Sequence, residues 1–586
     1  MDSFNEMSGG SMMQLSEEQR NWVTLKLNEH VMLKFNMEEK RKLASKISDR
    51  IEFSIGNMDK LHRIWEKCID AYRTERSITP QRGVKKPQAT IHTPTMYTQC
   101  EVVTSMHSML MLDNARNFIK IVELDTCQRL YALENLLFNA VVDGGYRYEL
   151  SKVFKIAFLC GVGIGKLIPD YAAGIPIISA INIFDFFIDP SASSIGDAQY
   201  VCFRYWLSIE DVAARANSGE FDEREVDLMM KEFNLKTEIL KMLPTLEDYD
   251  LSASAGIGAR DASDTGEKST VSVPNRDITD TGNKFRRILC YEYWTKDKVI
   301  TVMEKKYIAR AVVNIFSEFP FYLFYTSPPL PGELWVKGMG ETILPLQDEI
   351  DTKRSQRIDN VNKILNPPVL RVMNTIKDDQ KLQYAAGNVI DCTTVDGVKP
   401  LPPIDATQQT TMEIMAIRSD IDEVTGANQT VMGMPVKKER MSVTETTNVY
   451  QRAQGRFEYS NLMLGITGLI PLLKGMLKMM SLMGGERNAP TDINNRGPIA
   501  KIPPEYLLKE YRISVQINPV QAQEDAQNAM TMYQILANDP MVNRDALLKF
   551  FVSRVFPDYP IDLFNSPMMQ PPVNNPVQGI DNNLKI

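Results

Sequence analysis

The feature that most constrains this fold is a pair of narrow apolar stripes on either side of a short proline-bounded insert. In residues 338–366 and again in 406–425, large apolar residues recur at spacings of three and four, with one step missing at Arg354. This period predicts two amphipathic helices. The stripes consist of Ile343, Leu346, Ile350, Ile358, Val361 and Leu365 in the first helix, and Ile414, Ile417, Ile421 and Val424 in the second.

Each stripe is narrow for a helix that is buried inside one globule, because the rest of its surface is polar or charged. A narrow seam is typical of rods that pack side by side with copies of themselves. We therefore expect lateral self-association through these seams before any chemistry is considered.

The insert between the rods predicts a small two-stranded unit. Pro367 and Pro368 stop the first rod, because proline cannot continue a helix and restricts the residue before it. VLRVM and NVIDC then read as short strands, and Pro400, Pro402 and Pro403 mark the return. Two strands of this size are marginal alone, so we expect neighbouring subunits to complete them.

A basic loop follows the second rod. Gly426 is suited to the C-terminus of that helix, and Ser442 with Glu445 forms a capping box that starts another. Between them lie Lys437, Lys438 and Arg440, which can touch passing phosphates without reading bases. A solvated charge run remains the alternative. In a ring of twelve copies the loop would bring about 36 cations within a Debye length of ~8–10 Å of threaded DNA.

Composition sets broad limits on the class of protein. The chain has 586 residues, 44% hydrophobic and 24% charged, which is ordinary for a folded protein. A net charge of -8 argues against coating nucleic acid by bulk attraction. The 32 Met residues favour adaptable contacts between subunits or simple filling of the core. Seven cysteines without a CxxC pair, and an acidic N-terminus without an apolar signal, favour assembly in a reducing cytoplasm.

The remaining pattern predicts an α+β fold. Helical periodicity marks residues 15–80, 114–157, 522–538 and 543–555. Residues 174–327 and 511–517 instead contain short period-two runs typical of a mostly antiparallel sheet. Residues 1–14, 251–284 and 558–586 hold few large apolar residues, and we expect a disordered start, a mobile surface insert and a flexible tail.

No catalytic or metal-binding pattern is evident, so we predict no metal, no cofactor and no enzymatic activity. Gly161, Gly163, Gly165 and Lys166 fail the phosphate-loop pattern, because Leu167 replaces the hydroxyl residue, and predict a tight turn between helix and strand. His30 and His62 are expected at the surface or an interface. The carboxylates Asp348, Glu349 and Asp351, and likewise Asp420, Asp422 and Glu423, are interpreted as solvated faces.

Residues 462–483 form an apolar stretch near the ~20 residues that cross a bilayer. Lys474 and Lys478 are costly in lipid, and Pro471 interrupts the helix. We therefore favour a buried, kinked helix within a multimer over a membrane span.

In this order the segments resemble the portal protein, or head-to-tail connector, of tailed bacteriophages, especially of the short-tailed kind. The resemblance covers roughly residues 15–520, and no single piece is diagnostic. It is carried by FDFFIDPSASSIGDAQYVCFRYWLS (184–208), FPFYLFYTSPP (319–329), GMGETILPLQDEIDTKRSQRIDNVNKILNPPVL (338–370), SDIDEVTGANQTVMG (419–433) and ERMSVTET (439–446).

The resemblance implies a ring of subunits, usually twelve, with a wing, stem, clip, tunnel loop and crown. Carried over by position, the expected parts are an N-terminal helical region of the wing (15–80), an α/β wing (81–338), a stem helix (339–366), a clip (367–405), a second stem helix (406–425), a tunnel loop (426–441), a long kinked helix (442–485), a return to the wing (486–519) and a C-terminal helical crown (520–557).

The resemblance also implies a function. The ring would occupy one capsid vertex of the virion, assemble in the bacterial host cytoplasm, and conduct double-stranded DNA during packaging and ejection without sequence readout. Expected partners are the terminase motor, a tail adaptor, and the major capsid and scaffolding proteins, with no membrane. The clip residues expected to dock partners are Pro367, Pro368, Val369, Leu370, Val389, Ile390 and Leu401.

Three alternatives stay open at this point. The chain could be a membrane-associated helical oligomer that uses residues 462–483, or a nucleotide-dependent packaging enzyme. A generic helical scaffold without a DNA channel is the third.

Overall fold

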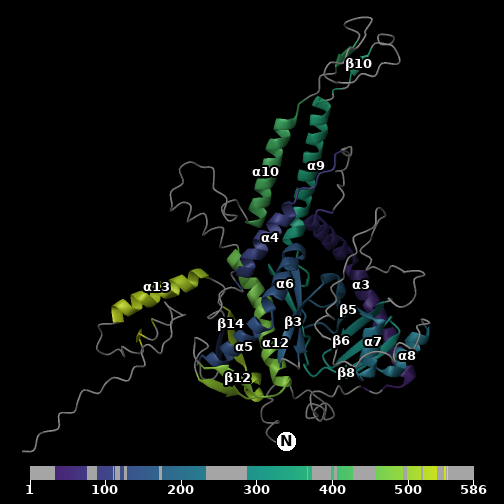
Figure 1. Ribbon diagram of the computed structural model, residues 1–586, viewed down its shortest axis with the longest axis vertical. Helices are drawn as coiled ribbons and strands as arrows, with labels where there is room; N and C mark the ends of the chain where they lie inside the picture. The colour runs from purple at the N-terminus through teal and green to yellow at the C-terminus, as the bar shows by residue number, and fades with distance from the viewer. Residues whose placement is uncertain are drawn as a thin grey trace, which may run out of the picture.

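The computed structural model shows a broad body of helices and sheets from which two helices project, α9 (Met339–Leu365) and α10 (Thr407–Thr425) (Figure 1). Strand β10 (Val369–Arg371) lies beyond their far end. The residues described are 33, 35–75, 89–109, 111, 119–123, 129–170, 174–232, 287–365, 367, 369–371, 398–400, 405–426, 457–491, 498–515, 519–536, 547–548 and 551.

The other helices of the described residues are mostly in the body. In chain order they are α3 (Met37–Arg73), α4 (Thr95–Ser108), α5 (Tyr131–Asp143), α6 (Tyr146–Cys160), η3 (Ile183–Asp185), α7 (Ile209–Asn217), α8 (Glu223–Glu232), η8 (Gly465–Leu469), α12 (Ile470–Leu482), η9 (Pro504–Leu508) and α13 (Pro519–Leu536).

Every strand pair in the described part of the chain is antiparallel, as predicted. The sheets have the orders β4-β5-β6-β7-β8, β3-β2-β9, β1-β14, β10-β11 and β12-β13. The strands are β1 (Ile119–Glu123), β2 (Val162–Asp170), β3 (Ile175–Ile181), β4 (Phe186–Ile188), β5 (Val201–Ser208), β6 (Arg287–Trp294), β7 (Lys298–Met303), β8 (Tyr307–Val313), β9 (Phe321–Tyr325), β11 (Val398–Pro400), β12 (Arg487–Pro490), β13 (Ile499–Ile502) and β14 (Tyr511–Val515).

The five-stranded and three-stranded sheets are joined by a buried ion pair. Lys166 of β2 lies 2.6 Å from the carboxylate of Glu292 in β6. The ammonium group also lies over the rings of Phe203, Trp294 and Phe321, so its charge is enclosed by aromatic faces. A lysine that the sequence placed beside a turn is therefore a link between two sheets.

The apolar helix near residue 470 packs against the three-stranded sheet. It runs from Phe457 to Leu482 and includes the π-helical turn η8 followed by Pro471, the usual causes of a helix irregularity. Gly468 lies against the ring of Phe324, and Gly475 lies against Tyr322, both from β9. The glycines bring the helix close to the strand.

The predicted helical region 114–157 is wrong at its start. Residues 119–123 form β1, which pairs with β14 at the other end of the chain, with Ile121 opposite Ile513. Helices α5 and α6 occupy the rest of the region. Pairing with so distant a partner outweighed the local helical pattern.

The glycine-rich segment also differs from its prediction. Gly161 ends α6 with a φ of 88°, the left-handed conformation that favours glycine, so the predicted turn exists there. Gly163 and Gly165 instead lie within β2. A Cβ at position 163 would overlap the backbone of Val153, so close packing of α6 on the strand explains that glycine.

His62 is half-buried within the chain and not on the open surface, and its place at an interface stays a prediction. Its ring lies among Trp65, Phe184 and Phe187, and its Nε2 is buried without a hydrogen-bond partner among the described residues. Burial, aided by the charge of Arg204, lowers its pKa to about 4. His30 lies outside the described residues.

Candidate functional site

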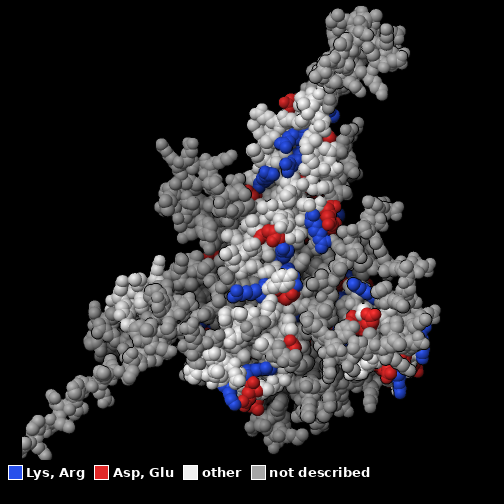
Figure 2. Space-filling view, viewed as in Figure 1, with Lys and Arg blue, Asp and Glu red and all other residues white. Residues whose placement is uncertain are grey.

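The projecting helix pair, defined as α9 and α10, is antiparallel and held by both charge and apolar contact. Lys353 Nζ lies 2.6 Å from Glu413 Oε2, and Arg357 Nη1 donates to Thr411 Oγ1 at 3.4 Å. Figure 2 shows Lys and Arg side chains gathered on the visible face of the pair. The two contacts fix which residues of α9 lie level with which residues of α10.

The isoleucines nearest the body are buried within the single chain. These are Ile343, Ile350, Ile414, Ile417 and Ile421, which join the core formed with α3, α4 and the sheets. Leu346, Ile358 and Val424 are half-buried. Toward the far end Val361 and Leu365 are 37% and 65% exposed. The expectation that these stripes are too narrow to be buried in one chain is therefore wrong for the half next to the body.

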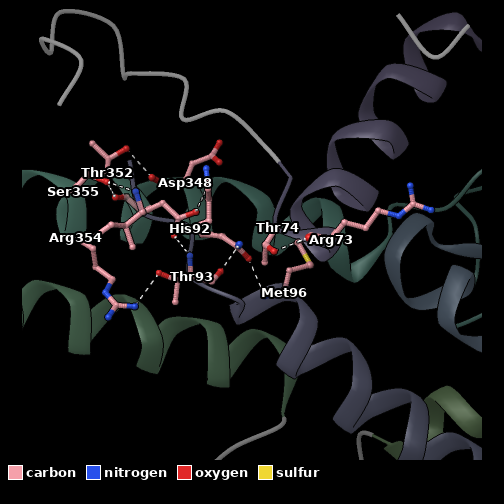
Figure 3. A network of polar contacts seen from close by, with 12 residues as sticks. Arg73, Thr74, His92, Thr93, Met96, Asp348, Thr352, Arg354 and Ser355 are labelled. Atoms are coloured by element: carbon pink, nitrogen blue, oxygen red, sulfur yellow. Dashed lines mark hydrogen bonds and ion pairs between the residues drawn. The ribbon is translucent and has the colours of Figure 1, made fainter. Parts of the chain in front are cut away.

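Polar side chains widen the buried face of α9, and the stretch 89–96 lies along them (Figure 3). We call this stretch the strap. Four side chains of α9, spaced four residues apart, accept hydrogen bonds from its backbone N–H groups. The pairs are Ala89 N to Asp359 Oδ1 (2.9 Å), Ile91 N to Ser355 Oγ (3.1 Å), Thr93 N to Asp351 Oδ1 (2.7 Å) and Met96 N to Gln347 Oε1 (2.8 Å).

The strap runs antiparallel to α9 and satisfies buried polar groups on both sides. Gln347 Nε2 donates back to Thr93 O at 2.8 Å, and Arg354 donates to Thr93 Oγ1 at 3.3 Å. Burial raises the pKa of the Asp351 carboxyl, while the Thr93 N–H opposes that rise. The interpretation of Asp351 as part of a solvated face is therefore wrong.

The base of the helix pair is also tied to the body by polar contacts. Gln99 Nε2 of α4 donates to Asp422 Oδ1 at 3.0 Å, and Thr425 Oγ1 donates to Gln99 Oε1 at 3.1 Å. Burial raises the pKa of the Asp422 carboxyl, and the bond from Gln99 lowers it. Gly426 ends α10 in the left-handed conformation with a φ of 72°, as its position in the sequence predicts.

A cavity of about 900 Å³ opens at this base, between α4, α6, α10 and the start of the helix at Phe457. On its wall His107 is buried, and its Nδ1 lies 2.6 Å from Asn461 Oδ1. Burial lowers the pKa of His107 to about 4, so the ring is neutral near pH 7. Among the described residues no group of His, Cys, Asp and Glu is placed to hold a metal ion.

Several predicted site residues lie outside the described residues. These are the loop cations Lys437, Lys438 and Arg440, and the insert residues Pro368, Val389, Ile390 and Leu401. Pro367 is half-buried, while Val369 and Leu370 lie in β10 opposite Pro400 and Lys399 of β11. The insert thus contains a two-stranded unit, but with β11 at 398–400.

Two features of the pair were not predicted from the sequence. The strap gave no periodic signal, because its bonds come from backbone groups that any sequence carries. The outer face of α10 carries Met412 and Met415, 61% and 65% exposed. Their 4-3-4 spacing with Gln408 and Ser419 could have indicated a second contact face. The contact between copies was instead assigned to the isoleucine stripe on the opposite face of the helix.

One described helix, Phe457–Leu482, is long and apolar enough by composition to cross a membrane. Its side chains Leu464, Leu472, Leu473 and Met476 are buried in a core shared with α5, α6 and the β1-β14 pair. That burial is typical of a core helix, and packing inside this chain is enough to explain why the helix is long and apolar.

The comparisons identify the class of protein that these features define. A family model described as phage SU10 portal protein matches residues 170–551, well over half of the chain. The chain therefore belongs to the phage SU10 portal protein family, whose members are structural proteins of the head-to-tail connector. Three sequence-based conclusions are confirmed by this match: a portal protein, a bacteriophage origin and a structural role.

No curated protein matches the chain. Among solved structures, a chain from a "Neck of empty GTA particle computed with C6 symmetry" is similar at 10% identity with a TM-score of 0.34. That similarity covers 82% of this chain and 97% of the other.

Proposed function

We propose that twelve copies of this chain form a ring at one vertex of the capsid, with the projecting helix pairs around a hollow axis. Double-stranded DNA passes along this axis during packaging and ejection without sequence readout. The observation that carries the proposal is the family match over residues 170–551, which includes both helices of the pair. The exposed apolar side chains on the pair support assembly, since a lone chain leaves them in water.

The parts of the chain follow from this arrangement. The body with its two larger sheets is the wing, the helix pair is the stem, and β10 with β11 is the clip. Residues 426–441 are the tunnel loop, and α13 contributes to the crown. Figure 1 supports this division, because β10 lies at the far end of the pair and α13 lies apart from it.

Partners follow from position. The clip end is the free end of the pair and docks the terminase motor during packaging and a tail adaptor afterwards. The body meets the major capsid and scaffolding proteins. The motor supplies ATP hydrolysis, and this chain supplies the channel within the virion after assembly in the host cytoplasm.

Imaging of the purified protein together with its particle mass tests the ring. We expect a closed ring with a central hole and a mass near twelve times 66.5 kDa. A stable monomer at high protein concentration would overturn the proposal.

The proposed DNA contact is tested separately, by replacing Lys437, Lys438 and Arg440 together with Gln. We expect intact rings but impaired packaging or retention of DNA, because the tunnel loses about three positive charges per copy. A matched control replaces the exposed Lys42, Lys46 and Arg63 of α3 with Gln, which changes the net charge equally. Equal packaging and retention by both variants would contradict the loop assignment.

A further inference from the structure

The outer face of α10 is unusual on this helix pair because it carries no charge along three turns and has two exposed methionines at its centre. Gln408, Met412, Met415 and Ser419 follow one another at 4-3-4 spacing, and Ala416 lies beside them. All five are exposed, and they lie opposite the buried Ile414, Ile417 and Ile421. We call these five residues the methionine face. A 4-3-4 seam of this kind is typical of contact with a second helix.

The outer face of α9 has the opposite character. Pro345 and Lys363 are exposed along it, and Glu349 and Gln356 are half-buried between them. Glu349 lies one turn before Lys353, at the border with the contact to α10. This face is polar and charged, so the two outer faces of the pair are different surfaces. A ring needs two different patches that meet head to tail, whereas a patch that meets itself closes a two-fold dimer.

The register of the pair brings complementary charges to the same height. Lys353 of α9 contacts Glu413 of α10, and the two helices are antiparallel. Moving toward the body from this contact, Glu349 lies four residues from Lys353 along α9, and Arg418 lies five residues from Glu413 along α10. With a rise of about 1.5 Å per residue, Glu349 and Arg418 lie level to within about one residue. Arg418 is exposed and follows Met415 by three residues, so it borders the methionine face.

We propose that the methionine face of one copy packs against the outer face of α9 in the next copy, with Arg418 paired to Glu349 across the contact. This contact rests on the proposed ring. If the ring axis runs along the helix pair, a given residue lies at the same height in every copy, so Arg418 of one copy is level with Glu349 of the next. Met412 and Met415 then cover the stem of Gln356 of the neighbour, and methionine's flexible chain adapts to it.

Charge reversal tests the pairing. Arg418→Glu and Glu349→Arg, each alone, should raise the protein concentration needed for half assembly by about ten-fold, because each puts like charges together at every contact. The double variant Arg418→Glu/Glu349→Arg should restore assembly, since the pair is re-formed with its signs exchanged. Analytical ultracentrifugation measures the ring fraction. Thermal unfolding of the single variants should stay close to that of the natural chain, because Arg418 is exposed and Glu349 is only half-buried.

A second experiment tests the apolar contact and its direction. Met415→Ser should weaken assembly, whereas the matched control Phe53→Ser, on a 64% exposed residue of α3, should not. Under oxidation, a Glu349→Cys/Arg418→Cys variant should give a ladder of cross-linked oligomers, and Met415→Cys alone should give none beyond the natural chain's own background.

The outcomes separate this contact from the ring itself. Rings that form normally in both single charge reversals would overturn the contact and leave the ring standing. Efficient cross-linking of Met415→Cys into dimers would also overturn it, because the methionine faces would then meet each other. Absence of any ring from the natural chain would overturn both proposals.

Discussion

The close approach of the helix Phe457–Leu482 to β9 makes one substitution especially informative, Gly475→Ala. A Cβ at position 475 would overlap the hydroxyl of Tyr322 and come within 2.7 Å of its Cζ. Tyr322 is buried between the helix and the sheet, so its ring has no room to swing aside. Overpacking a core costs about 1–3 kcal/mol, and an overlap this close to a buried ring belongs in the upper part of that range, about 2–3 kcal/mol. Alanine in place of glycine inside a helix returns about 1 kcal/mol. We expect a net loss of about 1–2 kcal/mol.

Thermal unfolding at one fixed protein concentration measures this effect, because assembly shifts the apparent Tm. For a chain of 586 residues a loss of this size lowers the Tm by about 1–2 °C, because the entropy of unfolding grows with chain length. The matched control is Gly56→Ala in the middle of α3, where an added Cβ meets nothing within 4 Å. That variant should be as stable as the natural chain or up to about 1 kcal/mol more stable. Equal Tm values for the two variants would refute the packing argument.

Three further predictions concern buried polar groups. Lys166→Met should lower stability by about 3–5 kcal/mol in thermal unfolding, because it leaves the enclosed carboxylate of Glu292 with its hydrogen bond from Trp294 but without the ammonium that neutralises it. Lys166→Met/Glu292→Gln should recover part of that loss. The pKa of His107 is lowered to about 4 in the folded chain, below its ordinary value of 6.5. The stability of the folded chain that depends on neutral His107 is therefore fully present above pH 6.5 and is lost as the pH falls toward 4. The free energy of unfolding changes by up to about 1.4 kcal/mol per pH unit in this range. His107→Gln should remove that contribution to the slope in unfolding measured from pH 7 to 4, while the contribution of His62, whose pKa is also lowered to about 4, should remain. Ser355→Ala should make the Ile91 amide exchange with solvent at least ten-fold faster, measured by hydrogen exchange, because that N–H loses its acceptor.

Local patterns in the sequence predicted the parts of the fold that local rules control. The antiparallel strands of the five-stranded sheet carry alternating apolar residues and turn signals, and each appears as a strand. The ends of the two rods follow from Pro367 and Gly426, whose backbone preferences act within one or two residues. Prediction succeeded wherever a residue acts on its immediate neighbours.

Contacts between distant segments were beyond the same reasoning. Strand β1 needs β14 beside it, and the strap needs α9, but neither partner is visible from the local sequence. The burial of His62 and Lys166 depends in the same way on aromatic rings from other elements. At the candidate site, the apolar spacing predicted helices that need a neighbour, but not which face that neighbour covers.

The isoleucine face of α10, for which the sequence predicted contact with other copies, is buried within the chain, and the methionine face is exposed. Two substitutions test which of the two faces forms the contact between copies. Ile421 is buried in the chain's own core, so Ile421→Ser should destabilise the subunit by roughly 2–5 kcal/mol, as for other large-to-small core changes. Met415 is 65% exposed, so Met415→Ser should leave subunit stability nearly unchanged and weaken only assembly. Thermal unfolding reports the first effect and ultracentrifugation the second. If Ile421→Ser instead kept the Tm and abolished rings, the isoleucine seam would be the contact between copies, and the burial seen here would not describe the assembled subunit.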